Sequence, residues 1–223
     1  MNSTTTLSHN NLLSKELFLN FLITCGLLSS IIYIAADIIA SIQWDSYNYS
    51  AQGISELMAI EAPTRPLLVF LFTINNLLTL AFGYGILKIE NSNKALRITG
   101  VLIIIYSVIG LIALHFTPMH SKGIGAGTLT DTLHIIFTFT LVVIMFTLIG
   151  FGAFTSGKKF KIYSIATILL IIGFGIIAGA QAPKIAANQP TPGLGILERI
   201  NIYSYMLWIA VFSVMLMRRE KES

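Results

Sequence analysis

The chain has 223 residues, of which 55% are hydrophobic and only 11% are charged, and its net charge is +4 at pH 7. A soluble domain usually carries about a quarter charged residues, so this composition excludes an ordinary soluble globular protein. The basic balance fits the cytoplasmic surface of a membrane protein better than a nucleic-acid partner, and no nucleic acid is expected to bind. The single cysteine, Cys25, excludes a disulfide within the chain and a cysteine-based metal site.

Six apolar runs follow one another, and each has about the 20 residues needed to cross a bilayer. They cover residues 17–42, 67–88, 98–116, 132–154, 163–181 and 200–217. Such continuous runs predict helices, because a backbone in lipid must satisfy its own hydrogen bonds. We therefore expect an all-α, polytopic integral membrane protein. A single six-helix transmembrane domain over 17–217 would lie between a polar tail, 1–16, and a basic tail, 218–223.

Lysine and arginine are divided unevenly between the loops of the two sides. Ten of the fourteen fall on one side: Lys15, Lys88, Lys94, Arg97, Lys158, Lys159, Lys161, Arg218, Arg219 and Lys221. The other side has Arg65, Lys122, Lys184 and Arg199. The positive-inside rule then places both termini in the cytoplasm of a cell-membrane protein, and the even number of helices agrees. The long connections 43–66, 117–131 and 182–199 would face outward.

The first apolar run contains an ionisable residue, Asp37, close to its outer end. At helical spacing it shares a face with Ser30, Tyr33 and Ser41. A charged side chain in the hydrocarbon region costs a few kcal/mol and normally faces a partner or a water-filled cavity. Two interpretations stay open: a structural aspartate that locks the first helix to its neighbours, or a substrate-binding wall of a polar pocket.

The first outer loop reads DSYNYSAQGISELMAIEAPTRP, and its part 53–61 has the pattern of a short amphipathic helix. Ser55 and Glu56 are catalytic candidates, and Arg65 is a candidate for positioning a substrate. A serine nucleophile needs a base at hydrogen-bond distance, which the sequence does not identify. The alternative is an interfacial helix that lies flat on the membrane.

Three histidines and an aspartate surround the second outer loop. Asp131 and His134 are three residues apart and so lie on one face of the fourth helix, while His115 and His120 precede them. An aspartate can hold a histidine ring in one tautomer while the other ring nitrogen moves a proton or binds a metal. These four residues could also form a zinc site, although no HExxH pattern is present. Histidines satisfied by backbone or lipid headgroups are the competing interpretation.

The remaining polar groups lie in the second, fifth and sixth helices. Asn76, near mid-membrane, and Glu198 and Arg199, at the start of the sixth helix, are substrate-binding candidates. Glu198, Asn201 and Tyr205 share one face of that helix. Gly175 and a second glycine four residues later form a GxxxG pattern, which favours a notch for helix packing.

The segments ISELMAIEAPTRP, HFTPMH, DTLH and GLGILERI resemble an uncharacterised family of prokaryotic membrane proteins, numbered 998 among the domains of unknown function. The resemblance spans most of the chain and implies a six-helix bundle with polar outer loops and no assigned activity. The family is similar in turn to eukaryotic membrane proteins of the Frag1/DRAM type, some linked to lipid-anchor remodelling, which implies lipid chemistry by analogy. His120 stands where the family often has an acidic residue. The matching positions are Ser55, Glu56, Ala62, Pro63, Arg65, Pro118, Asp131, His134 and Glu198.

These observations favour a lipid-directed hydrolase or transferase with an outward-facing polar pocket, and membrane lipids as partners. The catalytic candidates are His134, Asp131, His120, Glu56 and Ser55, and the substrate-binding candidates are Asp37, Arg65, Glu198, Arg199 and Asn76. The alternative is a non-enzymatic lipid-binding or accessory protein. A small-solute or ion transporter ranks lower, because the inner halves of the helices are poor in polar residues. A transmembrane haem relay is disfavoured, because those halves contain no histidine.

Overall fold

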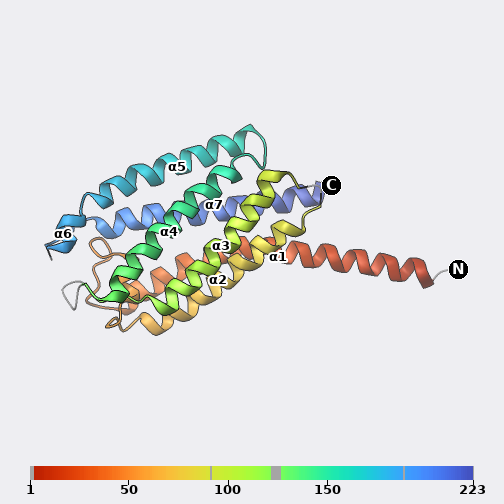
Figure 1. Cartoon of the computed structure of the whole chain (residues 1–223). Helices are drawn as coiled ribbons and strands as arrows, with labels where there is room; N and C mark the ends of the chain where they lie inside the picture. Colours follow the sequence, from red (N-terminus) through yellow and green to blue (C-terminus); the bar gives the residue numbers. More distant parts are fainter. Residues whose placement is uncertain (1–2, 91, 122–126, 188, 223) are drawn as a thin grey trace.

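The computed structural model describes residues 3–90, 92–121, 127–187 and 189–222 (Figure 1). Its helices are α1 (Ser3–Gln43), the 3-10 helix η1 (Ile54–Met58), α2 (Arg65–Lys88), α3 (Lys94–Phe116), α4 (Leu129–Gly152), α5 (Lys158–Gly179), α6 (Ala182–Ala186) and α7 (Leu194–Glu222). Within these described ranges there is no strand, and six helices are long and apolar enough to cross a membrane. The expected all-α bundle of six spans is confirmed.

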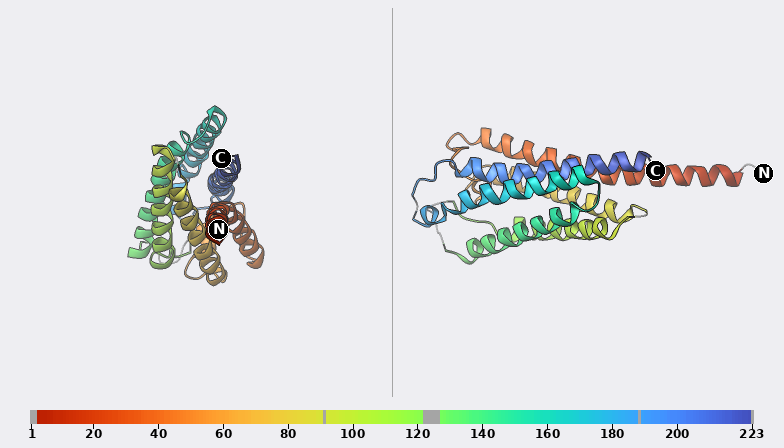
Figure 2. Two further views of the ribbon diagram at one scale, coloured as in Figure 1. Left: turned by 90° about the vertical axis from the view of Figure 1, so that its right-hand side faces the viewer. Right: turned by 90° about the horizontal axis from the view of Figure 1, so that it is seen from above.

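The helices pack largely in chain order, because short connections favour antiparallel neighbours. α2 lies between α1 and α3, α4 follows on α3, and α7 lies between α1 and α5. α4 and α5 are close at one end of the bundle and diverge toward the other (Figures 1 and 2). α1 begins and α7 ends at the end where α4 and α5 meet, which we call the terminal end. The opposite end, with the three long connections, is the loop end.

Two helices are longer than the apolar runs predicted. α1 begins at Ser3 and projects beyond the bundle, so most of the expected tail 1–16 is helical (Figure 1). α7 likewise continues through the basic tail to Glu222. Neither tail contains a glycine or proline that would stop a helix. Residues 1, 2 and 223 of these tails lie outside the described residues.

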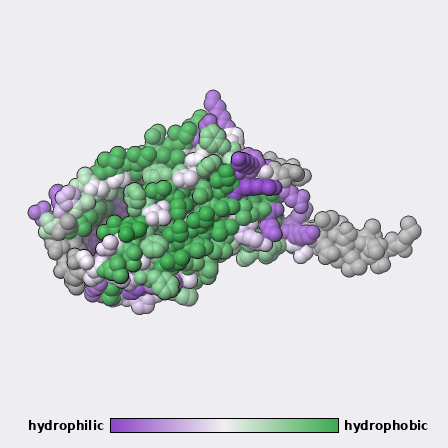
Figure 3. Space-filling view, viewed as in Figure 1, coloured by the Kyte–Doolittle hydropathy of each residue, from purple (hydrophilic) through white to green (hydrophobic). Residues whose placement is uncertain are grey.

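Basic residues mark the terminal end. α2 ends at Lys88, α3 begins at Lys94, and α5 begins at Lys158. Hydrophilic surface gathers at this end, whereas the flank of the bundle is hydrophobic (Figure 3). Lys122, from the smaller basic group, lies outside the described residues.

The core has two parts, one toward each end. Toward the terminal end, Trp208 of α7 packs against Phe160 and Phe212 and donates its Nε1 hydrogen to the Ser164 hydroxyl of α5 at 2.9 Å. At the loop end, the fully buried Ile54 and Leu57 of η1 pack with residues of α1 and α2. The expected amphipathic helix 53–61 is therefore a shorter 3-10 helix whose apolar residues Ile54 and Leu57 pack into the bundle.

Candidate functional site

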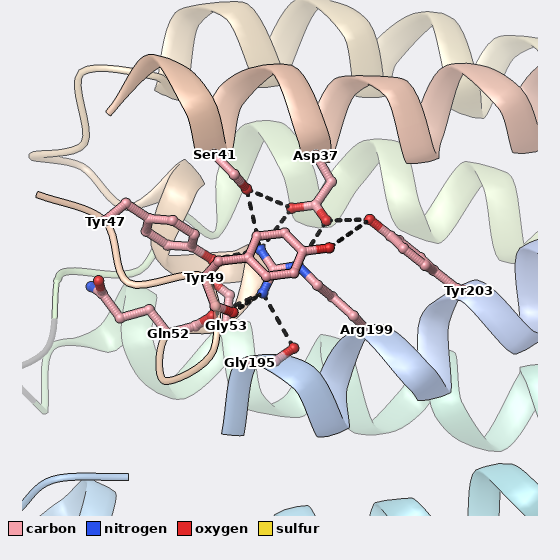
Figure 4. Close-up of polar contacts among 9 residues, drawn as sticks. All are labelled: Asp37, Ser41, Tyr47, Tyr49, Gln52, Gly53, Gly195, Arg199 and Tyr203. Carbon is pink, nitrogen blue, oxygen red and sulfur yellow. Dashed lines mark hydrogen bonds and ion pairs between the residues drawn. The ribbon is translucent and has the colours of Figure 1, made fainter. Parts of the chain in front are cut away.

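Asp37 and Arg199 form a buried ion pair between α1 and α7 (Figure 4). The guanidinium donates from Nε to Asp37 Oδ2 at 2.8 Å and from Nη2 to Oδ1 at 2.9 Å. This is the two-pronged geometry for which a guanidinium and a carboxylate are matched. The side chain of Asp37 is 0% exposed and that of Arg199 is 3% exposed. Asp37 therefore joins α1 to α7 through Arg199, as expected of a structural aspartate.

The rest of the guanidinium holds the first connection against α7. Nη1 donates to the carbonyls of Tyr49, Gln52 and Gly195 at 2.8, 3.1 and 3.2 Å. The Tyr49 ring also lies over the guanidinium carbon, 3.6 Å from its centroid, as in a cation–π contact. We call Asp37, Arg199 and these loop contacts the clamp, because they fasten the segment between α1 and α2.

Two tyrosines complete the hydrogen bonds of the clamp. Tyr203 donates its hydroxyl to Asp37 Oδ2 at 2.5 Å, one turn of α7 beyond Arg199. Tyr47 accepts from Arg199 Nη2 at 2.7 Å and is within 2.9 Å of the Gln52 carbonyl. Burial raises the pKa of Tyr47, and the nearby guanidinium offsets only part of this effect, so the phenol stays protonated and neutral.

Two glycines allow the loop to approach α7 closely. A Cβ at Gly195 would collide with the Gln52 and Tyr49 carbonyls, and a Cβ at Gly53 would collide with the Glu198 carboxylate. The Glu198 carboxylate therefore lies against the residue that precedes η1. A negative charge is favourable at this place, because the first N–H groups of a helix have no partner within the helix.

Beside the clamp, a cavity of about 720 Å³ lies between the diverging helices α4 and α5 and the helices behind them. We call it the lateral cavity. Its flank is apolar, with Val142 and Phe146 from α4 and Ile172 and Ile176 from α5. Ile176 is also 68% exposed, so this flank opens toward the surroundings of the bundle. Figure 3 shows hydrophilic surface in the depth of a hollow near the loop end, between hydrophobic surfaces.

The inner wall of the lateral cavity is polar. Its polar residues come from α1, α2, α3 and α7 and are Ser29, Tyr33, Asn75, Asn76, Thr79, Tyr106, Asn201 and Tyr205. Some are already engaged: Asn75 Nδ2 donates to the Ser29 carbonyl at 2.9 Å, across helices as expected of asparagine in a membrane. Asn201 Oδ1 and the Tyr205 hydroxyl are buried with no hydrogen-bond partner among the described residues.

The loop end of the cavity is its most charged part. Arg65 lies there and donates from Nη1 to the Met58 carbonyl at 2.7 Å. Ser55, His134 and Glu198 line the same region. The lateral cavity therefore combines an apolar flank, an uncharged polar depth and a charged rim.

The structure divides the ten predicted catalytic and substrate-binding residues into two equal groups. The cavity wall includes Ser55, Arg65, Asn76, His134 and Glu198. The described wall does not include Asp37, Glu56, His120, Asp131 or Arg199. Glu56 accepts from the Gly53 N–H at 3.2 Å and from Gln52 Nε2 at 2.9 Å, which fixes the start of η1. The second group therefore holds the loop end together.

The expected pairing of Asp131 with His134 does not occur. Asp131 Oδ1 instead accepts from the backbone N–H of His120 at 2.8 Å and lies 3.3 Å from its Nδ1. Oδ2 accepts from the Thr128 hydroxyl at 2.8 Å, in a capping box at the start of α4. His134 Nδ1 donates to the Thr117 carbonyl at 3.2 Å, which leaves Nε2 unprotonated in the neutral ring.

The four residues proposed as a metal site are not brought into one cluster. His115 Nε2 lies 3.1 Å from the Thr73 hydroxyl, whereas His120 pairs with Asp131 and His134 faces the cavity. In the described parts of the chain, no group of three or more His, Cys, Asp or Glu side chains is placed to hold a metal ion.

Tyr203 of the clamp and Tyr106 of the cavity wall were not singled out from the sequence. A tyrosine within a lipid-length helix is a usable signal, because its hydroxyl needs a partner there. The GxxxG pattern had a different meaning from the one expected: a Cβ at Gly175 would lie 3.8 Å from Asn201 Nδ2, and one at Gly179 would meet nothing within 4 Å. Gly175 keeps space open in the cavity.

Comparison with known families adds one assignment. The model of a family described as "Protein of unknown function (DUF998)" matches residues 27–215. The chain belongs to this family. The DUF998 match runs from within α1 to within α7 and so contains both the clamp and the lateral cavity, and it confirms the resemblance found in the sequence. Neither the curated proteins nor the solved structures contain a match to the chain.

Proposed function

We propose that this DUF998 protein binds a membrane lipid in the lateral cavity. The observation that carries the proposal is the composition of the cavity wall, which is apolar on the α4–α5 flank and polar behind and at the loop end. A lipid has the same division between chain and headgroup. A volume of about 720 Å³ also lies within the range of roughly 300–1,000 Å³ that is usual for small-molecule sites.

The proposed orientation follows from charge. Ten of the fourteen lysines and arginines belong to the terminal end, and basic loops face the cytoplasm in most membrane proteins. The terminal end is then cytoplasmic, and the lateral cavity lies in the outer half of the membrane. A lipid of the outer leaflet would enter between α4 and α5 with its headgroup near Arg65 and His134.

A cavity-filling variant tests lipid binding. Gly175→Leu places a large side chain into the cavity, where only Asn201 lies near the new Cβ. Gly173→Leu is a matched control on α5, because nothing lies within 4 Å of its Cβ position and residue 173 is outside the described wall. Lipid that co-purifies in mild detergent is extracted and quantified by mass spectrometry. We expect one lipid class to be lost from Gly175→Leu and retained by the wild type and Gly173→Leu. Equal lipid content in these three proteins would refute the proposal.

A second candidate is a lipid-directed hydrolase or transferase, and one observation favours it. His134 lines the cavity with Nε2 unprotonated in the neutral ring, as a general base requires, and Ser55 lines the same cavity. The test is hydrolysis of a panel of radiolabelled lipids by the purified protein. Activity lost in both His134→Gln and Ser55→Ala would support an enzyme, whereas no turnover of any lipid that binds would leave the binding function alone.

A further inference from the structure

A second hollow lies at the terminal end of the bundle, where α7 ends beside the connection from α4 to α5. We call it the terminal groove. Its volume is about 550 Å³, and its described wall has no residue in common with that of the lateral cavity. Ser156, in the connection, forms one part of the wall. The other described wall residues all belong to α7 and are Ala210, Val211, Val214, Met215, Arg218 and Arg219.

The α7 side of the terminal groove is an apolar stripe that ends in a positive charge. The stripe has the i, i+3, i+4, i+7 spacing that places residues on one face of a helix, here Val211, Val214, Met215 and Arg218. At 1.5 Å per residue, it runs about 10 Å inward from Arg218. One leaflet contributes about 15 Å of hydrocarbon, so this length matches the upper part of an acyl chain. Val211 is 36% exposed, so the stripe is open to the surroundings of the bundle.

Arg218 and Arg219 lie where the headgroup of a lipid in this groove would be. The membrane-length span of α7 ends at Arg219, so both residues belong to the boundary between membrane and water. Both are exposed, and neither forms an ion pair with another described residue. A guanidinium presents its N–H donors in a planar fork that suits the oxygens of a phosphate. The Ser156 hydroxyl offers one more donor in the same wall.

The charge around the terminal groove favours a negative headgroup. The described wall contains two arginines and no carboxylate, and two exposed lysines, Lys158 and Lys159, follow Ser156 at the start of α5. A zwitterionic headgroup would bring a cation of its own into this positive field and lose part of the attraction of its phosphate. In the orientation proposed above, the groove lies in the cytoplasmic leaflet. That leaflet contains acidic lipids, and basic pockets between helices on this side bind their headgroups.

We infer that the terminal groove is a binding site for a phospholipid with a net negative headgroup. Arg218 and Arg219 hold the phosphate, and one acyl chain lies along the apolar stripe toward Val211. The inference goes beyond the lipid binding proposed for the lateral cavity and does not depend on it, because the two walls have no described residue in common.

The experiment compares two lipids that differ in the net charge of the headgroup. Dipalmitoyl phosphatidylglycerol and dipalmitoyl phosphatidylcholine share both chains and the phosphodiester. Their dissociation constants for the first bound lipid are measured by native mass spectrometry on the delipidated full-length protein in detergent. Each basic residue beside an acidic lipid raises the affinity about fivefold, so with two arginines we expect phosphatidylglycerol to bind about 25-fold more tightly. Equal affinities for the two lipids would overturn the inference.

Charge variants assign the preference to the two arginines. Arg218→Gln and Arg219→Gln should each reduce it about fivefold, and the double variant should bring the two affinities within about twofold of each other. Lys94→Gln/Arg97→Gln is the matched control, because it removes two exposed positive charges from the same end of the bundle but outside the described groove wall. The control should keep the wild-type preference. An equal loss in both double variants would overturn the inference, since a general basic surface would then explain the binding.

A groove-filling variant tests the place of the acyl chain. Ala210→Leu leaves both arginines intact but narrows the groove, and it should weaken the binding of phosphatidylglycerol at least about fivefold. Ala178→Leu, at a partly exposed position of α5 outside both described walls, should leave it unchanged. Wild-type binding by Ala210→Leu would overturn the placement of the chain. Thermal melting in lipid-free detergent, followed through the buried thiol of Cys25, checks that each variant is folded.

Gly175→Leu separates this inference from the proposed function. Gly175 lines the lateral cavity and not the terminal groove, so the preference for phosphatidylglycerol should persist in this variant. A preference abolished by Gly175→Leu would place the acidic lipid in the lateral cavity and overturn the inference. A preference that persists while the co-purifying lipid is also unchanged would support the terminal groove and refute only the function proposed for the lateral cavity.

Discussion

Removal of either charged partner of the clamp alone should destabilise the protein about as much as removal of both partners together. Asp37→Leu leaves the Arg199 guanidinium buried without a counter-charge, and Arg199→Met leaves a buried carboxylate in the same position. Breaking a buried ion pair in this way costs about 3–5 kcal/mol. The double variant Asp37→Leu/Arg199→Met removes both charges of this pair but leaves the carbonyls of Tyr49, Gln52 and Gly195 without their donor.

The double variant should therefore be no less stable than the worse single variant, at about 3–5 kcal/mol below wild type instead of the sum of about 6–10. The coupling energy between the two residues would then be about 3 kcal/mol or more. Cys25 provides the assay, because the only thiol of the chain is 1% exposed and reacts with a fluorogenic maleimide when the bundle opens. For a chain of this size, each kcal/mol corresponds to about 2–4 °C in melting temperature.

The control for this cycle is Arg219→Met, which removes an exposed arginine from the terminal end of the same helix. Its effect should stay within about 0.5 kcal/mol. The assignment of the clamp as a coupled buried pair would be refuted if the single variants had the same melting temperature as the control. It would also be refuted if the double variant lost the full sum of the two single effects.

Three further predictions concern the loop end. Gly53→Ala should cost about 1–3 kcal/mol, because the backbone angles at residue 53 suit alanine and only the collision with the Glu198 carboxylate opposes the substitution. Gly157→Ala, at an open helix start, should be neutral in the thiol assay. Equal effects of the two variants would contradict the packing argument. Asp131→Ala should increase amide hydrogen exchange at His120 and in the first turn of α4 and should lower the free energy of unfolding by about 1 kcal/mol. Asp45→Ala should change neither quantity. Unchanged exchange at His120 in Asp131→Ala would exclude the capping role. The Ser121 N–H lowers the pKa of Glu61, so this bond is fully formed above the ordinary value of 4.5 and is lost as the pH falls through the lowered pKa. The protection of the Ser121 amide, measured against its intrinsic exchange rate at each pH, should fall in that acidic range in the wild type and should show no such transition in Glu61→Gln.

The fold could be predicted because it depends mainly on hydropathy along the chain, which can be read from the sequence directly. A bilayer fixes the length of an apolar run and requires helices, so hydropathy along the chain gives the number and place of the spans. The helix ends were harder, since the polar segments before Glu16 and after Met217 continue helices without any apolar signal. Helical propensity and the absence of glycine and proline decide there.

The candidate site could be predicted only in part, because its contacts join distant segments. Asp37 and Arg199 are 162 residues apart, and no local pattern pairs them. A chain-wide argument was available, since a membrane-buried aspartate needs a cation and Arg199 directly precedes the last apolar run. The spacing of Asp131 and His134 was misleading for a different reason: Thr128 and Asp131 form the T-x-x-D pattern of a capping box, which uses the carboxylate at its own helix start.

One turn of α7 joins the clamp to the lateral cavity. Adjacent residues of an α-helix point about 100° apart, so Arg199 faces α1 and the loop while Glu198 faces the cavity rim. Both contact the segment between α1 and α2, Arg199 by hydrogen bonds to the carbonyls of Tyr49 and Gln52, and Glu198 by its close approach to Gly53. Because Ser55 and Met58 of η1 line the cavity, the clamp determines where this part of the wall lies. The buried pair of Asp37 and Arg199 is thus a structural condition for the cavity, which we propose binds a lipid.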